Sequence, residues 1–344
     1  MLAVRLAGPG EPLRTEEVAI PALSAGEILI RVAGCGVCHT DLHIVDGRQT
    51  RVELPRTLGH EVSGYIEAAT PDAERTLAER SLAVGDPVLV FGGWGCGACR
   101  ECASGAEQRC AVSRAPGFQE DGGYAELMRV PDARHLVPLG RLDPVRAAPL
   151  ADAGVTPYRA IQRVLPWLAP GARVLLIGCG ALGRFALQYL RLVPDAGEEL
   201  HVTVRELDPA RLEQAAALGA DVGLLDGDAA MTLEAMGGPA DVVFDLVGKD
   251  ETLALATSVV TPGGVVMLVG EGGGAVRFAF ESAAIEAWLT NVAWGSRADL
   301  YAVVRLARRG RLHWDVEAVP LREAASAHDR LRAGESGARL VLVP

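Results

Sequence analysis

The stretch RVLLIGCGALGRFALQYL, residues 173–190, decides the fold because a glycine-rich turn joins a strand pattern to a helix pattern. After its first residue, RVLLI is a continuous apolar run, as in a parallel strand with both faces covered. In the G-x-G-x-x-G that follows, Gly178 permits the tight turn, Gly180 lets the backbone approach a pyrophosphate, and Gly183 lets helix and strand pack closely. The free N–H groups of the helix N-terminus suit phosphates. We therefore predict a dinucleotide site at Gly178, Gly180, Leu182 and Gly183, with a ligand-free turn as the alternative.

Strand and helix patterns alternate after this turn, which predicts a doubly wound parallel sheet over residues 152–287. The second strand, HVTVRE, ends in Arg205 and Glu206. An acidic residue here accepts hydrogen bonds from the ribose hydroxyls and favours NAD, whereas Arg205 would meet the 2′-phosphate of NADP if the strand ended one residue earlier. We favour NAD, and we also assign Val247 and Val269 to the cofactor site.

The first part of the chain has a different character. Residues 1–151 contain short β-type runs bounded by glycine and proline, which predict a β-barrel or folded sheet. The charged segment at residues 70–86 is expected to be a surface insertion, and a long helix is expected to begin at Leu150. Residues 288–344 contain two helix patterns and a final strand, which by pattern alone extend either domain.

Four of the seven cysteines lie in CGACRECASGAEQRC, residues 96–110. Disulfide frameworks belong mostly to short secreted chains, whereas this chain has 344 residues, is 49% hydrophobic and can bury an ample core. The spacing C-x2-C-x2-C-x7-C favours a closed tetrahedral zinc site that no substrate reaches. Its ligands would be Cys96, Cys99, Cys102 and Cys110; two disulfides or unpaired thiols are the alternatives.

Composition argues against several classes of function. The chain has 33 Lys+Arg and 44 Asp+Glu, a net charge of −11, and its acidic residues are scattered. This balance argues against nucleic acid and against an anionic membrane surface. The start lacks the apolar core of a signal peptide, and no apolar run approaches the ~20 residues of a membrane span. We therefore expect a cytoplasmic protein, in a compartment where thiols stay reduced and free to bind metal.

A second metal site is indicated by GVCHTDLH, GHE and PLADAGVTPY. Cys38, His60 and Asp152 would give Zn²⁺ three protein ligands and leave the fourth position open for water or substrate, as catalytic zinc requires. A lone cysteine is more often a small buried core residue. The three residues indicate a metal site only when they are taken together.

These motifs together resemble the zinc-dependent medium-chain alcohol dehydrogenases over essentially the full chain. The strings WGCGAC, ARHLVP and DAGVTPY are most similar to the bacterial secondary-alcohol dehydrogenases of that family. The resemblance implies a GroES-like β-barrel catalytic domain, a Rossmann domain and a return of residues 288–344 to the catalytic domain. It also implies two zinc ions, NAD(P) and a homodimer or homotetramer.

The resemblance assigns roles around the open metal site. Cys38, His60 and Asp152 become ligands of the catalytic zinc, Glu61 becomes an occasional ligand, and Asp41 orients His60.

The resemblance also implies a proton path and phosphate contacts. Thr40 would accept the alcohol proton and pass it by the cofactor ribose to His43, which can titrate near neutral pH. His39 and Arg339 would contact the pyrophosphate, the alternative being that they are solvated surface residues.

The expected activity is hydride transfer between NAD(H) and a small alcohol and its ketone or aldehyde, with a secondary alcohol favoured. Trp94 and Trp294 are assigned to the substrate pocket, although aromatics at such positions are equally often core residues. The alternatives are an imine or conjugated-alkene reductase of secondary metabolism and a nucleotide-binding protein without turnover. The complete set of open-site ligands, with Thr40 and His43, favours the alcohol–carbonyl reaction.

Overall fold

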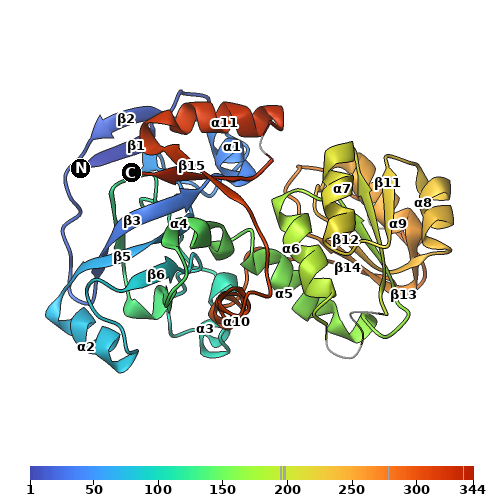
Figure 1. Ribbon diagram of the computed structural model, residues 1–344, viewed down its shortest axis with the longest axis horizontal. Helices are drawn as coiled ribbons and strands as arrows, with labels where there is room; N and C mark the ends of the chain where they lie inside the picture. Colours follow the sequence, from blue (N-terminus) through green and yellow to red (C-terminus); the bar gives the residue numbers. More distant parts are fainter. Residues whose placement is uncertain (194–195, 197–198, 278, 336) are drawn as a thin grey trace. The chain divides into compact units, whose positions relative to one another are not determined.

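The computed structural model describes residues 1–193, 196, 199–277, 279–335 and 337–344. It divides into two compact units, each with its own apolar core (Figure 1). Unit 1 consists of Met1–Val155 and Trp294–Pro344, and unit 2 of Thr156–Ala293. Within the described ranges, no helix is long and apolar enough to cross a membrane.

Unit 1 is built on β-sheet. A seven-stranded sheet runs in the order β15-β16-β3-β5-β6-β8, and β7 pairs with β3 beside this path. Its strands are β3 (Ile28–Gly36), β5 (Glu61–Ala69), β6 (Pro87–Val90), β7 (Leu127–Val130), β8 (Leu136–Pro138), β15 (Val316–Pro320) and β16 (Arg339–Val343). A three-stranded sheet adds β2 (Arg14–Glu17), β1 (Leu2–Leu6) and β4 (Arg56–Thr57).

The pairing of β3 brings distant segments together. Its end, Gly36, lies opposite Glu61 of β5 and opposite Val341 of β16. A Cβ atom at Gly36 would lie 1.9 Å from a carboxylate oxygen of Glu61, so only glycine fits this close approach. The register therefore places the start of β5 and the last strand beside the segment that enters α1 (His39–Val45).

Two expectations for unit 1 need correction. The segment at residues 70–86 is not a simple surface insertion, because it contains α2 (Pro71–Glu79), whose Ala73 and Leu77 are buried in the core of unit 1. The helix expected from Leu150 begins later, as α5 (Val155–Val164). A 3₁₀ turn, η3 (Ala148–Ala151), precedes it, and the backbone of Asp152 (φ −136°, ψ −64°) leaves the helical region there.

Unit 1 also contains further helices and 3₁₀ turns. They are α3 (Arg100–Ala103), η1 (Glu107–Arg109), η2 (Ala133–His135), α4 (Pro144–Ala147), α10 (Arg297–Arg308), η5 (Leu321–Glu323) and α11 (Ala324–Ala333).

Unit 2 contains the parallel sheet that the sequence predicts. Six strands, all parallel, run in the order β11-β10-β9-β12-β13-β14. They are β9 (Arg173–Ile177), β10 (His201–Glu206), β11 (Val222–Leu225), β12 (Ala240–Asp245), β13 (Val260–Leu268) and β14 (Trp288–Asn291). The order reverses between β9 and β12, which is where doubly wound sheets bind ligands.

Helices cover both faces of this sheet (Figure 1). They are α5, η4 (Leu165–Trp167), α6 (Ala181–Leu190), α7 (Pro209–Ala217), α8 (Ala229–Met236) and α9 (Asp250–Val259). Asp208 caps α7 by accepting a hydrogen bond from the Ala210 N–H (2.9 Å), and Pro209 occupies the first helical position, as Asp-Pro predicts. The predicted doubly wound architecture is confirmed.

Candidate functional site

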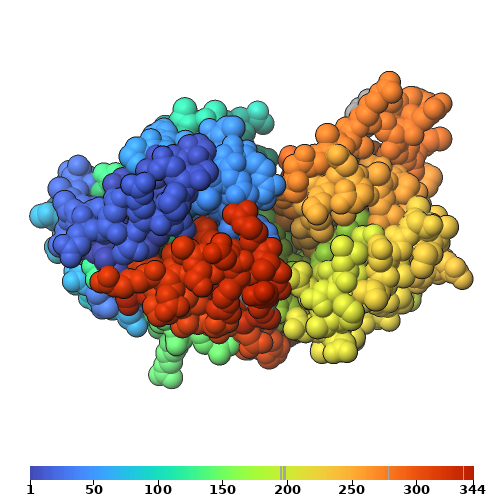
Figure 2. Space-filling model, turned by 90° about the horizontal axis from the view of Figure 1, so that it is seen from above, coloured from blue at the N-terminus to red at the C-terminus, as the bar shows by residue number. Residues whose placement is uncertain are grey.

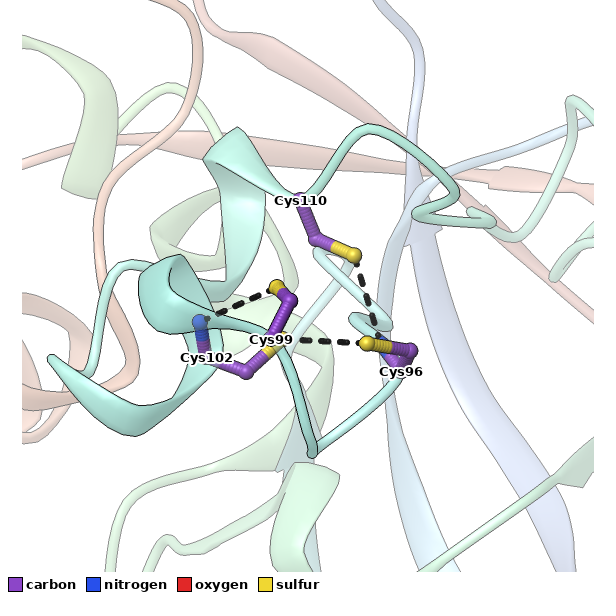
Figure 3. A group of neighbouring side chains, drawn as sticks. All are labelled: Cys96, Cys99, Cys102 and Cys110. Carbon is purple, nitrogen blue, oxygen red and sulfur yellow. Dashed lines mark hydrogen bonds between the residues drawn. The ribbon is translucent and has the colours of Figure 1, made fainter.

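The four-cysteine loop converges on one point. Figure 3 shows the side chains of Cys96, Cys99, Cys102 and Cys110 turned toward one another, and their ligand atoms all lie within 4.8 Å of each other. Cys96 Sγ and Cys102 Sγ are 4.0 Å apart, about twice the length of a disulfide bond. All seven cysteines are free thiols, which removes the disulfide alternative for this structure.

The loop favours the thiolate form of Cys96, whereas burial raises the pKa of Cys102 to about 12. The backbone N–H groups of Ala98 and Cys99 lower the pKa of Cys96 to about 6. Cys99 caps α3, and its Sγ accepts the N–H of Cys102 (3.5 Å). Two sulfurs bound about 2.3 Å from a tetrahedral zinc lie about 3.8 Å apart, so the 4.0 Å separation fits a closed Zn–S₄ site.

The second group of candidate ligands, called the metal-ligand group or open site below, comes from three separate elements. Cys38 precedes α1, His60 and Glu61 begin β5, and Asp152 follows η3. Their ligand atoms also lie within 4.8 Å of one another. Asp152 Oδ2 is 3.8 Å from Cys38 Sγ and 3.5 Å from His60 Nε2. Asp152 is the one member of the group that is partly exposed.

These distances fit a metal ion. Two ligand atoms about 2.0–2.3 Å from a tetrahedral zinc lie about 3.3–3.8 Å apart, the range found among Cys38, His60 and Asp152. Burial alone would lower the pKa of His60, but the carboxylates of Asp41 and Asp152 outweigh it and raise the pKa. The negative potential that raises this pKa also favours a bound cation.

The carboxylate of Asp41 sets the orientation of the His60 ring. Asp41 Oδ1 lies 3.3 Å from His60 Nδ1, which leaves Nε2 directed at Asp152 and Cys38. Asp41 is itself fixed, because its Oδ2 accepts the Cys38 N–H (2.9 Å) in the capping box of α1. The sequence C-x-x-D, from Cys38 to Asp41, thus positions two groups at once: the candidate ligand Cys38 and the carboxylate that orients His60.

Glu61 has a different environment from Asp152. It is fully buried, and its carboxylate accepts the Ala153 N–H (3.2 Å) and two hydrogen bonds from Arg339, one of them from Nε at 3.1 Å. Burial lowers the pKa of Arg339 and Glu61 raises it by more, whereas burial raises the pKa of Glu61 and Arg339 opposes that rise. The pyrophosphate contact expected for Arg339 stays a prediction, and the structure adds a partner that the sequence did not indicate.

The proposed proton path lies on α1. Thr40 and His43 are half-buried, whereas His39 is exposed. Burial and the positive charge of Arg48 lower the pKa of His43, and Asp46 partly opposes them. His43 is therefore held in the neutral form at neutral pH.

The glycine-rich turn of unit 2 has the geometry that its spacing predicts. Gly178 has φ of 90°, a conformation that favours glycine, and Gly180 caps α6. A Cβ atom at Gly183 would lie 2.5 Å from the Gly178 carbonyl oxygen, so helix and strand approach as the third glycine requires. Leu182 is half-buried in the first turn of α6.

The acidic residue after the second strand is placed by backbone amides. Glu206 is the last residue of β10, and its carboxylate accepts N–H groups of Cys179 (2.7 Å), Leu207 (2.7 Å) and Asp208 (3.3 Å). Arg205 binds elsewhere: its guanidinium donates to Asp226 (2.5 Å) and to the Gly227 carbonyl oxygen (3.1 Å).

Two further assigned residues stand at strand ends of the same sheet. Val247 follows β12, and its N–H donates to Asp245 Oδ1 (2.9 Å). Val269 follows β13, and its N–H donates to the Asp245 carbonyl oxygen (2.8 Å).

The two assigned tryptophans lie in different surroundings. Trp94 is core: its indole N–H donates to the Phe91 carbonyl oxygen (2.6 Å), and its ring packs on His135 at 5.9 Å. Trp294 is next to the metal-ligand group, with its ring 6.1 Å from that of His60 and 5.9 Å from that of Phe118. It has φ of 53°, and its ring lies over Gly92.

Sequence reasoning missed three residues near the ligands. Phe118 packs edge-on against His60 (5.8 Å), and Tyr124 and His328 form a buried hydrogen-bonded pair connected to Asp41. The glycines before His60 and before Tyr124 were a usable signal, since a Cβ at Gly59 would lie 2.4 Å from the Tyr124 ring. His328 gave no comparable signal.

A dinucleotide fold in the same chain as a buried thiolate–imidazole–carboxylate group defines a metal-dependent oxidoreductase. Two sequence families match: the alcohol dehydrogenase GroES-like domain at residues 24–141 and the zinc-binding dehydrogenase domain at residues 218–342.

Individual relatives cover nearly the whole chain. D-arabinose 1-dehydrogenase (NADP(+)) of Saccharolobus solfataricus is 34% identical over 97% of this chain and 95% of its own length. NAD-dependent alcohol dehydrogenase of Sulfurisphaera tokodaii is 33% identical over 100% of both. The crystal structure of the Aeropyrum pernix alcohol dehydrogenase matches with a TM-score of 0.90 and 34% identity over 100% of both chains. The chain belongs to the zinc-dependent alcohol dehydrogenase family of medium-chain dehydrogenases/reductases.

Proposed function

We propose that this protein interconverts secondary alcohols and ketones with NAD(H). The observation that carries the proposal is the convergence of Cys38, His60 and Asp152 at zinc-ligand distances. A zinc ion held there supplies a Lewis acid that lowers the pKa of an alcohol oxygen or polarises a carbonyl. Glu61 already accepts hydrogen bonds from Arg339 and the Ala153 N–H. In this proposal it lies beside the zinc ligands and does not have to bind the metal.

The proton path in this proposal uses residues of α1. Thr40 accepts the proton of the alcohol hydroxyl, and His43 delivers it to solvent. The lowered pKa of His43 supports this role, because a neutral imidazole is ready to accept a proton at neutral pH. His39, exposed on the same helix, is assigned to the phosphates of the cofactor.

NAD rather than NADP is the proposed cofactor. Gly178, Gly180 and Gly183 shape the pyrophosphate turn, and the fixed carboxylate of Glu206 suits the ribose hydroxyls but repels a 2′-phosphate. Arg205, which would favour a phosphate, is neutralised by Asp226. Relatives of similar identity are named for NAD and for NADP, so the argument rests on these side chains.

An apolar substituent on the substrate is proposed from the rings near the metal ligands. Trp294 and Phe118 form edge-on contacts with His60 and with each other. Such a wall suits an alkyl or aryl group better than the hydroxyl groups of a sugar.

The test combines metal analysis with an NADH absorbance assay on a panel of secondary alcohols, ketones and aldoses. We expect two zinc ions per chain, turnover of apolar secondary alcohols and ketones, and a strong preference for NAD. Glu206→Ala should weaken NAD much more than NADP. Zinc-loaded protein without turnover of any alcohol or carbonyl compound would refute the proposal.

We also propose a homo-oligomer, a homodimer or homotetramer, associating through the β14 edge. This strand ends the six-stranded sheet of unit 2, and Trp288, Ile285 and Phe280 are 62%, 73% and 97% exposed. The orange segment between β13 and β14 stands out from the surface (Figure 2). A second copy that pairs with β14 would cover these apolar side chains. A cytoplasmic location is proposed from the seven free thiols.

A further inference from the structure

The carboxylate of Asp41 makes more contacts than it needs in order to orient His60. Its side chain is fully buried, and Oδ2 accepts both the Cys38 N–H (2.9 Å) and the Tyr124 hydroxyl (3.1 Å). Oδ1 faces His60 Nδ1 at 3.3 Å. A buried carboxylate with an incomplete set of donors is costly, so each donor helps fix where the carboxylate points.

Tyr124 reaches Asp41 from a rigid support. Its side chain is fully buried, and its backbone N–H donates to the Leu58 carbonyl oxygen (2.9 Å). Its ring fills the space at Gly59, where a Cβ atom would lie 2.4 Å from the ring and 2.6 Å from Cys35 Sγ. The residue thus packs against the segment that leads into His60 and bonds to the group behind it.

His328 continues the chain of hydrogen bonds. It lies on α11, is 4% exposed, and places Nε2 3.1 Å from the Tyr124 hydroxyl oxygen. Because Asp41 accepts the hydroxyl proton of Tyr124, His328 Nε2 must carry a proton and donate it. Burial raises the pKa of Tyr124, with help from Asp41, and burial lowers that of His328, which agrees with a protonated phenol and a neutral imidazole.

We propose that Tyr124 and His328 are positioning residues of the open metal site, acting through Asp41 on His60. The order of donors runs from His328 Nε2–H to the Tyr124 oxygen and from the Tyr124 O–H to Asp41 Oδ2, and the other oxygen of Asp41 lies 3.3 Å from His60 Nδ1, where it favours a proton on that nitrogen. This order leaves the lone pair of His60 Nε2 for the metal. The inference rests on the proposed function insofar as it takes Cys38, His60 and Asp152 to be zinc ligands.

Metal binding is the direct test. Tyr124→Phe keeps the ring and removes the hydroxyl, His328→Leu removes the donor, and His328→Gln restores an N–H. Zinc affinity is measured by competition with a chromogenic chelator, and ligand geometry by the visible spectrum of the cobalt-substituted protein. We expect Tyr124→Phe and His328→Leu each to lower the zinc affinity of the open site about 10-fold, which is the low end of the loss found when a residue that supports a metal ligand is removed. Both variants should also shift the visible bands of the cobalt-substituted protein.

Several controls separate positioning from general destabilisation. The four-cysteine site of each variant is the internal reference, and its affinity should not change. Tyr189→Phe removes a buried phenol from unit 2 and should leave both sites unaffected. His328→Gln should recover most of the affinity, and the double variant Tyr124→Phe/His328→Leu should lose little more than either single variant, because both act through one chain.

The outcomes are distinguishable. If wild-type protein binds zinc at the four cysteines alone, the proposed function fails. If wild-type protein binds two zinc ions, but Tyr124→Phe and His328→Leu keep the affinity and cobalt spectrum of the open site, this inference is overturned and the proposed function stands. A fall in melting temperature without a change in metal affinity overturns it equally.

Discussion

Two carboxylates of the metal-ligand group differ in what surrounds them. Glu61 is paired with Arg339 and the Ala153 N–H, whereas Asp152 directs Oδ2 at Cys38 Sγ and His60 Nε2. A carboxylate already neutralised by arginine gains less from a metal than one turned toward a thiol and an imidazole. Of the two carboxylates, we therefore expect Asp152 to contribute more to metal binding.

We expect Asp152→Ala to lower the zinc content from two ions per chain to one, since the two ligand groups are separate. Turnover should fall by more than about 100-fold, because losing a ligand costs more than losing a partner behind one. Atomic absorption and steady-state kinetics measure the two effects. Asp152→Cys is the matched variant, since Cys₂His is an established zinc set, and it should retain the metal. Full zinc content and turnover in Asp152→Ala would contradict the assignment.

We expect His43 to set the pH dependence of alcohol oxidation. Burial and then Arg48 lower its pKa, so the imidazole remains a proton acceptor to pH values below its usual range. In Arg48→Gln the positive charge is gone, the pKa of His43 rises, and the acidic limb of the kcat/KM profile should move to higher pH. Arg51→Gln, an exposed charge on the same loop, is the control. An unchanged limb in Arg48→Gln would remove His43 from the path.

Residue identity was easier to predict than residue partnership. Cys38, His60 and Asp152 stand in short motifs whose chemistry limits the choice of role, and the structure brings them together. Arg339 also stood out, but its partner Glu61 lies in β5 and is brought beside it only by the pairing of β16 with β3 and β3 with β5. Tyr124 and His328 carry no motif, and their contact depends on the packing of α11.

At the scale of elements, α2 is a helix whose sequence is rich in charge but which still contributes buried side chains to the core of unit 1. Four of its nine residues, PDAERTLAE, are charged, yet Ala73 and Leu77, four positions apart, point into unit 1. The segment was expected to be a surface insertion because its charges dominate the composition. The strands of unit 2 were easier to predict, since a strand such as RVLLI is apolar at every position after its first.

Leu77→Ala should therefore destabilise unit 1 by about 2–5 kcal/mol, the cost of a cavity in a packed core. Glu74→Ala, on the exposed face of the same helix, should change stability by less than about 0.5 kcal/mol. Urea unfolding followed by circular dichroism compares the two. Equal midpoints for both variants would show that α2 is only a covering of the surface.

At the scale of the whole molecule, the two edges of the unit 2 sheet can be compared directly. β14 carries exposed Trp288 and β11 carries exposed Leu225. If β14 is the interface between copies, Trp288→Lys should yield monomers in sedimentation velocity, because an unpaired charge would be buried at the contact. Leu225→Lys should leave the oligomer intact. A monomeric wild-type protein, or an oligomer insensitive to Trp288→Lys, would contradict the proposal.

The path of the chain through unit 1 has a consequence for biosynthesis. A ribosome delivers Cys38, His60, Glu61 and Asp152 before any of unit 2, but it delivers Arg339 only after unit 2 has been made. Until then, the carboxylate of Glu61 lacks its counter-charge, and the place of β16 beside β3 is open. The three zinc ligands are therefore synthesised before the nucleotide-binding unit, but unit 1 can complete its sheet and pair Glu61 only after that unit has been made.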